Sequence, residues 1–286
     1  VSAVLAYKQK LTETGGNMSI IDIGEGKVAL GFSVALQDFE AYSRRDYGKP
    51  FRDAQVGMLP PKLAQILINL GNGREGADGQ KIIVDPFCGT GTILMEALLM
   101  GLSVIGSDKE ARLTEGAKLN IDWLRQTFPQ MDRPSGALIS KPPPPGDGIT
   151  PWRDPAAARP GVHVDTKAQL FQKDATALKA ADIQAGDITT FKSAPQKTDV
   201  DQPFAIVTEP FLGPVLSAFP AENFLAKLQS DLEKLYLDFF RNLAMWLPKG
   251  TPIVFIFPYW KKHGDPPVRF ATTLVAKIEA LGYSKT

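Results

Sequence analysis

Residues 81–92, with the sequence KIIVDPFCGTGT, constrain the fold of this chain more than any other stretch. Three β-favouring apolar residues, Ile82 to Val84, lead into an acid and then into a loop that contains Gly89 and Gly91. An apolar pattern of helical character follows over residues 93–100. This order predicts a strand, a tight glycine turn and a helix, which together bring backbone N–H groups and the positive end of a helix close to a ligand.

A second predicted strand, residues 103–107, is followed by Asp108. An acid at the tip of this strand, about 20 residues after the glycine loop, is placed to bind the hydroxyl pair of a ribose. A P-loop is excluded because no Gly-Lys-Ser/Thr follows the glycines. A dinucleotide fingerprint is incomplete because Leu94 follows where its third glycine is needed.

Two interpretations of the loop remain. The pattern Asp-Pro-Phe-x-Gly-x-Gly at residues 85–91 resembles motif I of S-adenosylmethionine (SAM) dependent methyltransferases, especially those that methylate amino groups of nucleic-acid bases. The alternative is an ordinary glycine-rich turn between a strand and a helix in another α/β enzyme. The order and spacing of the two acids and the glycines favour the methyltransferase interpretation.

The composition limits the classes of protein. The 286 residues are 44% hydrophobic and 22% charged, which is typical of one large α/β domain or two small ones. With a net charge of +1, any nucleic-acid site must be a local patch. The single cysteine and two histidines predict neither an internal disulfide nor a metal site. No apolar run spans a membrane and no signal peptide is recognised, so we expect a cytoplasmic protein.

Strands alternate with helices along most of the chain, which predicts an α/β fold with a doubly wound, mostly parallel sheet, Rossmann-like and covered on both faces. Beyond the first three elements, the predicted helices are residues 63–70, 110–124, 222–247 and 267–281. The predicted strands are residues 168–173, 204–208 and 251–258. Residues 19–23 and 27–34 are expected to form a short N-terminal β-hairpin around the turn 24–26.

We predict a division into residues 1–36, a hairpin and linker that is the remnant of an upstream domain, and residues 37–286, the main domain. Two long loop inserts interrupt the main domain at about 129–165 and 179–202. The first is rich in proline and is interpreted as an exposed surface loop, with a substrate-contacting lid as the alternative.

Residues 37–52 combine basic and aromatic side chains. Such groups can bind phosphates and stack bases, which makes candidate substrate-binding residues of Arg44, Arg45, Tyr47, Lys49 and Arg52. Composition alone favours the other interpretation, a solvated connecting segment whose aromatic residues pack on the domain.

An acid stands at the end of each of the first four strands of the predicted sheet: Asp85, Asp108, Asp174 and Glu209. Ligands of such sheets bind beyond the carboxyl ends of the strands. Asp174 is placed to hold the adenine amino group of SAM. The candidate cofactor-binding residues are Asp85, Phe87, Cys88, Gly89, Thr90, Gly91, Asp108, Lys109, Asp174 and Ala175.

Methylation of an exocyclic amino group needs acceptors for its two hydrogens, which free the nitrogen lone pair, and in-line positioning of the methyl group. Glu209 can be the first acceptor, the Pro210 carbonyl the second, and the Phe211 ring can stack the base. These three residues are the candidate catalytic residues. Base methylation through a cysteine nucleophile is set aside because Cys88 lies in the glycine loop and not near the fourth strand.

Motif I, the segment MLPPKLA at 58–64 with Asn69 and Leu70, and RDYGKP at 45–50 together resemble the methyltransferase domain of tRNA guanine-N2 methyltransferases of the guanosine-10 type. The resemblance covers roughly residues 37–260. It implies SAM as cofactor, tRNA as nucleic-acid partner, and an N-terminal RNA-binding domain that is absent here or lies upstream of Val1. The chain departs from the family's Asp-Pro-Pro-Tyr, because Glu209 replaces the aspartate and Phe211-Leu212 replaces Pro-Tyr.

Other functions stay open on the sequence alone. A DNA amino-methyltransferase would need to flip its base out of the stack. The altered motif at 209–212 suits a catalytically weak SAM-binding partner subunit. A nicotinamide dehydrogenase is the most distant alternative.

Overall fold

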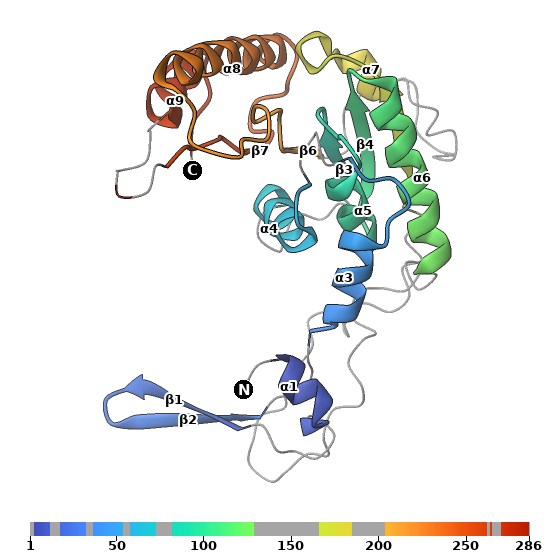
Figure 1. Cartoon of the computed structure of the whole chain (residues 1–286), viewed down its shortest axis with the longest axis vertical. Helices are drawn as coiled ribbons and strands as arrows, with labels where there is room; N and C mark the ends of the chain where they lie inside the picture. The colour runs from blue at the N-terminus through green and yellow to red at the C-terminus, as the bar shows by residue number, and fades with distance from the viewer. Residues whose placement is uncertain are drawn as a thin grey trace. The chain divides into compact units, whose positions relative to one another are not determined.

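The computed structural model describes residues 3–11, 18–32, 37–53, 58–72, 82–128, 166–184, 204–261, 264 and 270–285. The chain divides into two compact units, residues 1–48 with 132–164, and residues 49–131 with 165–286. The elements of both units are drawn in Figure 1. The division into 1–36 and 37–286 made from the sequence stays a prediction.

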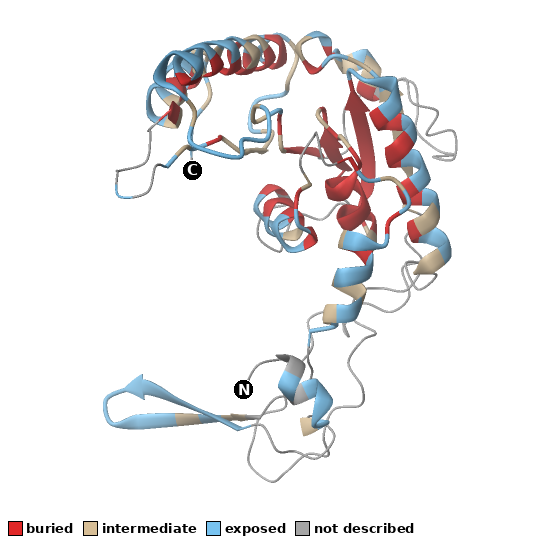
Figure 2. Cartoon of the chain, viewed as in Figure 1, coloured by how far each residue is buried: buried red, intermediate tan, exposed pale blue. Residues whose placement is uncertain are grey.

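The first unit contains the predicted β-hairpin. Strands β1 (Met18–Gly24) and β2 (Lys27–Phe32) pair antiparallel, with Ile20 opposite Leu30. Gly24 and Gly26, at φ angles of 84° and 69°, allow the tight reversal between them. Every residue of β1 is exposed (Figure 2). The hairpin is therefore confirmed, and the last two residues of its predicted return strand lie outside the described residues.

Two helices of the first unit were not predicted. They are α1 (Ala3–Lys8) and α3 (Phe39–Tyr47). The Asp38 carboxylate caps α3 by accepting a hydrogen bond from the Ala41 N–H at 2.9 Å, and Gly48 ends the helix. Part of the presumed connecting segment 37–52 is thus regular helix.

The second unit is built on a five-stranded parallel sheet. Its strands are β3 (Ile82–Asp85), β4 (Ser103–Asp108), β5 (Ala168–Gln172), β6 (Phe204–Thr208) and β7 (Ile253–Phe255), and their order is β5-β4-β3-β6-β7. Each neighbouring pair is parallel. The chain winds outward in one direction from β3 through β5, and then returns to the other side of β3 for β6 and β7. This reversal places the switch point of the sheet between β3 and β6, where such folds bind ligands.

Helices cover both faces of this sheet (Figure 1). Alternate strand residues point to opposite faces, so Ile83 packs with α4 (Pro61–Asn72), α5 (Thr92–Leu99) and α6 (Ala111–Thr127). Its neighbours Ile82 and Val84 pack on the other face with α8 (Glu222–Ala244) and α9 (Phe270–Glu279). The predicted doubly wound, mostly parallel fold is confirmed.

The predicted insert 129–165 lies outside the described residues, as do residues 185–202 of the second insert. The described start of the second insert contains the short helix α7 (Ala180–Gln184), in which Ile183 is buried. A 3-10 turn, η2 (Ala175–Ala177), precedes it. The described start of this insert is therefore a short helix that contacts the core through Ile183, and the rest of the insert stays a prediction. No helix within the described residues is both long and apolar enough to cross a bilayer.

Candidate active site

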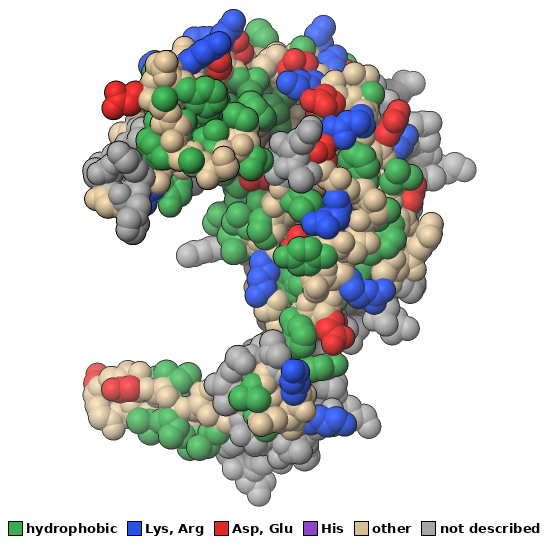
Figure 3. All heavy atoms as spheres, viewed as in Figure 1, with side chains coloured by type: hydrophobic (Ala, Val, Ile, Leu, Met, Phe, Trp, Pro, Cys, Tyr) green, Lys and Arg blue, Asp and Glu red, His purple; other side chains and the backbone are tan. Residues whose placement is uncertain are grey.

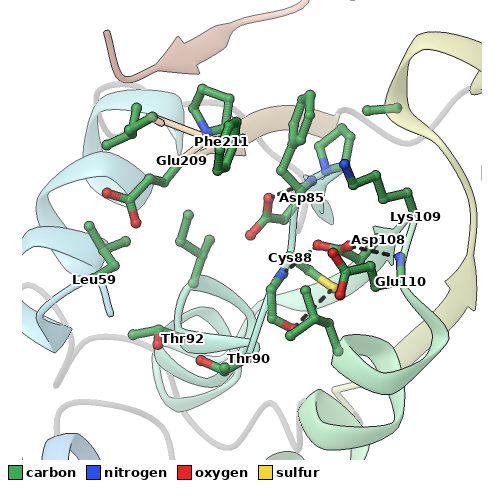
Figure 4. Close-up of a pocket in the computed structure, with 18 of the residues that line it drawn as sticks. Leu59, Asp85, Cys88, Thr90, Thr92, Asp108, Lys109, Glu110, Glu209 and Phe211 are labelled. Atoms are coloured by element: carbon green, nitrogen blue, oxygen red, sulfur yellow. Dashed lines mark hydrogen bonds between the residues drawn. The ribbon is translucent and has the colours of Figure 1, made fainter. Parts of the chain in front are cut away.

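A cavity of about 630 Å³ opens at the carboxyl ends of β3, β4 and β6 (Figure 4). Twelve of the thirteen residues predicted to bind cofactor or to act in catalysis line it; the exception is Gly91. Other residues that line it include Met58, Leu59, Thr92, Glu110, Arg112 and Leu235. The sheet therefore brings together at one site residues that lie far apart in the sequence.

The glycine loop forms one wall of the cavity and is held tightly against its surroundings. Gly91 caps the N-terminus of α5 with a φ angle of 83°, and a Cβ atom there would lie 3.0 Å from the Ala117 Cβ. The Cys88 N–H donates to the Ser107 carbonyl at 2.9 Å. The positive end of α5 therefore faces the cavity, a suitable environment for an anionic ligand group.

Asp108 connects the loop to the tip of β4. Its Oδ2 accepts a hydrogen bond from the Gly89 N–H at 3.1 Å, and its Oδ1 accepts one from the Glu110 N–H at 3.0 Å. Burial raises the pKa of Asp108, and these two N–H groups oppose that shift. A carboxylate offers about four acceptor positions, so Asp108 retains capacity for a ligand on its cavity side.

Asp85 forms the floor of the cavity at the end of β3. Its Oδ1 accepts hydrogen bonds from the Thr208 hydroxyl at 2.5 Å and from the Phe87 N–H at 3.2 Å. Its side chain points into the cavity (Figure 4), although the residue is only 2% exposed. Burial raises the pKa of Asp85 to about 7, and the nearby carboxylates of Asp108 and Glu209 add to the shift.

Two buried polar residues that do not line the cavity hold the glycine loop in place. Lys49 is 3% exposed, and its Nζ donates to the Thr92 hydroxyl at 2.9 Å and lies 3.5 Å from the Thr90 hydroxyl. Asn120 of α6 is fully buried, and its Nδ2 donates to the carbonyls of Thr90 and Phe51 while its Oδ1 accepts from the Phe51 N–H. Asn120 was missed from the sequence, where the only signal was an amide within a helical pattern.

Two of the five predicted substrate-binding residues, Lys49 and Arg52, belong to the same unit as the cavity and do not line it. Arg44, Arg45 and Tyr47 belong to α3 of the first unit, where Arg45 is buried and Tyr47 is 66% exposed. Lys49 and Arg52 belong to the second unit, where Arg52 is exposed. A role in substrate binding stays a prediction for all five.

The acceptor side of the cavity is formed by Glu209, Pro210 and Phe211, which follow β6. Burial raises the pKa of Glu209, and its side chain lies on the opposite side of the cavity from Asp108 (Figure 4). The Phe211 side chain is 47% exposed, and its carbonyl accepts a hydrogen bond from the buried Tyr236 hydroxyl at 2.7 Å. The predicted acceptors and stacking ring thus lie together at the rim of the same cavity.

The remaining predicted residues also line the cavity. Asp174 precedes η2 and its Oδ1 accepts from the Thr176 N–H and hydroxyl, next to Ala175. Burial raises the pKa of the Cys88 thiol well above its usual range, which keeps it protonated and unsuited to nucleophilic attack. Within the part of the chain that the structure describes, no three histidine, cysteine or acidic residues gather as a metal site.

The sheet order, the glycine loop and the cavity at the strand ends define a Rossmann-like methyltransferase domain. The chain belongs to the family described as RMKL-like, methyltransferase domain, whose model matches residues 50–206.

Curated relatives confirm the resemblance read from the sequence. The tRNA (guanine(10)-N2)-dimethyltransferase of Methanothermobacter thermautotrophicus is 43% identical over 77 residues, which are 27% of this chain and 21% of that protein. The enzyme of the same name from Pyrococcus abyssi is 39% identical over 80 residues, 28% of this chain and 21% of that protein. The match thus spans about a fifth of the length of each relative.

A solved structure is more distant. The rRNA methyltransferase aviRa from Streptomyces viridochromogenes is 15% identical with a TM-score of 0.43, over 77% of this chain and 83% of that chain.

Proposed function

We propose that this chain transfers a methyl group from SAM to the exocyclic amino group of a nucleic-acid base, and that the base is guanine, at N2, in tRNA. The observation that carries the proposal is a cavity lined by the glycine loop and Asp108 on one side and by Glu209, Pro210 and Phe211 on the other. One side suits a nucleoside cofactor and the other suits an amino group.

The residues present fit SAM. A cavity of about 630 Å³ is within the usual range of about 300–1,000 Å³ for such ligands. Asp108 would accept hydrogen bonds from the ribose hydroxyls, Asp174 would accept one from the adenine amino group, and the N-terminus of α5 would face the carboxylate of the cofactor. Bound there, SAM supplies a methyl group on a positively charged sulfur.

Glu209 would orient the acceptor amine. Its carboxylate accepts a hydrogen bond from one N–H of the amino group, and the Pro210 carbonyl accepts one from the other, so that the lone pair is directed at the methyl group. The nitrogen loses one proton when the new bond forms, and a carboxylate whose pKa is raised by burial is suited to take it. The Phe211 ring would stack on the base.

The choice of tRNA guanine rests on the names of the relatives and on the motifs shared with their family. The cytoplasm, where tRNA is processed, fits this function. Capture of a whole tRNA would fall to the exposed residues Arg44, Tyr47 and Arg52 together with an upstream RNA-binding domain or a partner subunit. The other two predicted substrate-binding residues, Arg45 and Lys49, are buried.

The test is transfer of a labelled methyl group from SAM to bulk tRNA and, separately, to genomic DNA, followed by nucleoside mass spectrometry. We expect N2-methylguanosine from tRNA. Glu209→Gln keeps the shape but weakens the acceptor, and Glu222→Gln, an exposed glutamate on α8, is its matched control.

Other outcomes would contradict the proposal. Label in DNA alone would identify a DNA amino-methyltransferase. SAM binding without transfer to either nucleic acid would indicate the partner-subunit function.

A further inference from the structure

The order of the strands determines which part of the cofactor lies next to Asp85. In the sheet, β3 lies between β4, which carries Asp108, and β6, which precedes Glu209. If Asp108 holds the ribose and Glu209 holds the acceptor amine, the sulfur that joins them in the reaction has to lie over the end of β3. Asp85 stands at that end, so this inference rests on the proposed function.

The balance of the surroundings disfavours a negative charge on Asp85 when no cation is bound, because burial outweighs the hydrogen bonds from the Thr208 hydroxyl and the Phe87 N–H. The residue is 2% exposed, and Asp108 from β4 and Glu209 after β6 face the same cavity. Glu110 and Asp174 also line it, against two basic residues, Lys109 and Arg112. Arg112 is already paired with Asp53 at 2.6 Å. Acids therefore outnumber bases around the cavity, and Asp85 is the most deeply buried of those acids that line it.

We propose that Asp85 is the residue by which the cavity distinguishes the cationic cofactor from the neutral product of methyl transfer. SAM carries one net positive charge at neutral pH, whereas S-adenosylhomocysteine (SAH), which has lost the sulfonium, carries none. An ionised Asp85 attracts the first and gains no such attraction from the second.

Asp85 then changes between its protonated and its ionised form as the bound ligand changes. In the free protein, burial raises the pKa of Asp85 to about 7, so its protonated and ionised forms are both populated near neutral pH. When the cation binds, Asp85 ionises and its proton passes to the buffer. When only the neutral product remains, Asp85 takes a proton back from the solvent, which removes the attraction that held the cofactor.

The affinity for SAM depends on pH through Asp85. Below the pKa, binding of SAM has to displace a proton, so affinity for SAM falls as the pH falls. Between pH 8 and pH 6 we expect the dissociation constant for SAM to rise about tenfold through Asp85, and that for SAH to change little. The number of protons released to the buffer by Asp85 should increase steadily as the pH falls from 8 to 6.

The experiment is isothermal titration calorimetry of the protein with SAM and with SAH, in pairs of buffers of different ionisation enthalpy. The slope of the binding enthalpy against the ionisation enthalpy gives the protons released. We expect release with SAM, increasing toward pH 6, and little with SAH. Equal release with the two ligands would overturn the inference.

Asp85→Asn removes the ionisable group but keeps an acceptor for Thr208 and Phe87. We expect its affinity for SAM at pH 8 to fall at least about tenfold, its affinity for SAH to stay within about twofold, and the proton release to vanish. Protons exchanged by the ligand's own amino group appear in both proteins and cancel in the comparison. An equal loss for both ligands would contradict the role of Asp85.

Asp108→Asn is the matched control, because the ribose that Asp108 faces is common to both ligands. It should weaken SAM and SAH by the same factor and leave their ratio unchanged. The wild-type titration does not depend on either variant folding. Binding of neither ligand to the wild type would overturn the proposed function together with this inference, whereas SAM binding without linked protons would overturn the inference alone.

Discussion

The two sides of the cavity are built in opposite ways. On the glycine-loop side, buried polar groups hold the loop. Asn120 bonds to the backbone of Thr90 and Phe51, Asp108 accepts from the Gly89 N–H, and Lys49 donates to the Thr92 hydroxyl. On the acceptor side, the chain after β6 presents apolar side chains to solvent, with Phe211 at 47% and Val215 at 70% exposure. Figure 3 shows hydrophobic side chains gathered on the second unit beside α8.

This difference indicates which side is formed before ligand arrives. A loop whose N–H and C=O groups are satisfied by buried partners loses little entropy on binding, so the cofactor side is preorganised. Removing an exposed apolar rim from water lowers the free energy, and a nucleobase that stacks on the rim can do so. Substitutions on the loop side should therefore affect stability and cofactor binding, and those on the acceptor side should affect transfer to RNA.

The largest effect is expected at Glu209. Glu209→Ala should slow methyl transfer to tRNA by about a thousandfold, within the range typical of a lost group that assists proton transfer. The dissociation constant for SAM should change by less than about twofold, since Glu209 faces the acceptor. Single-turnover kinetics and calorimetry measure the two quantities, with Glu222→Ala as control. A variant with unchanged transfer would remove Glu209 from the site.

The next effect is on stability. Asn120→Ala removes three hydrogen bonds to backbone groups of Phe51 and Thr90, and should lower the free energy of unfolding by about 3 kcal/mol at about 1 kcal/mol per bond. Urea denaturation measures it. Asn223→Ala, an exposed asparagine on α8, should cost less than about 0.5 kcal/mol. Equal losses in the two variants would mean that these three hydrogen bonds, which we call the Asn120 clamp, make no specific contribution to stability.

A substitution at Lys49 tests whether this residue supports the glycine loop or binds the substrate. Lys49→Met removes the charged donor to Thr92, and we expect the dissociation constant for SAM to rise about tenfold, equivalent to about 1.4 kcal/mol. Its affinity for tRNA should not change. The matched variant Arg52→Met, at an exposed neighbour, should leave SAM binding intact. A loss of tRNA affinity in Lys49→Met, with SAM affinity retained, would restore Lys49 as a substrate-binding residue.

The smallest effect is expected at Phe211. Phe211→Ala should raise the KM for tRNA about fivefold, at the lower end of the roughly 1–3 kcal/mol of a stacking contact, because the ring is half exposed. Phe211→Tyr keeps the ring and should restore KM, and Phe224→Ala, an equally exposed ring on α8, is the control. If the two alanine variants behave alike, stacking by Phe211 is excluded.

The main sheet and the cavity were predictable because their signals are local. Apolar runs at 82–84 and 204–208 are buried strands, and an acid at the end of a strand of a parallel sheet necessarily lies near the other strand ends. Helix α3 was missed because the residue that it buries is charged, Arg45, so no apolar period marks it.

The support behind the loop could not be predicted for a different reason. Asn120 meets Phe51 across 69 positions of the sequence, and Lys49 meets Thr92 across 43. Hydrogen-bonding capacity can be read from a side chain, but its partner is decided by the packing of α6 on the sheet. A buried lysine and an exposed one have the same appearance in a sequence.

The Asn120 clamp also has a spectroscopic consequence. Phe51 lies in irregular backbone, yet its amide hydrogen is directed at a fully buried side-chain oxygen. Amides outside helices and strands usually exchange with deuterium rapidly, whereas this one can exchange only when the clamp opens. A single slowly exchanging signal from residue 51 would therefore report, in the intact protein and without any ligand, how often the glycine loop loses its support.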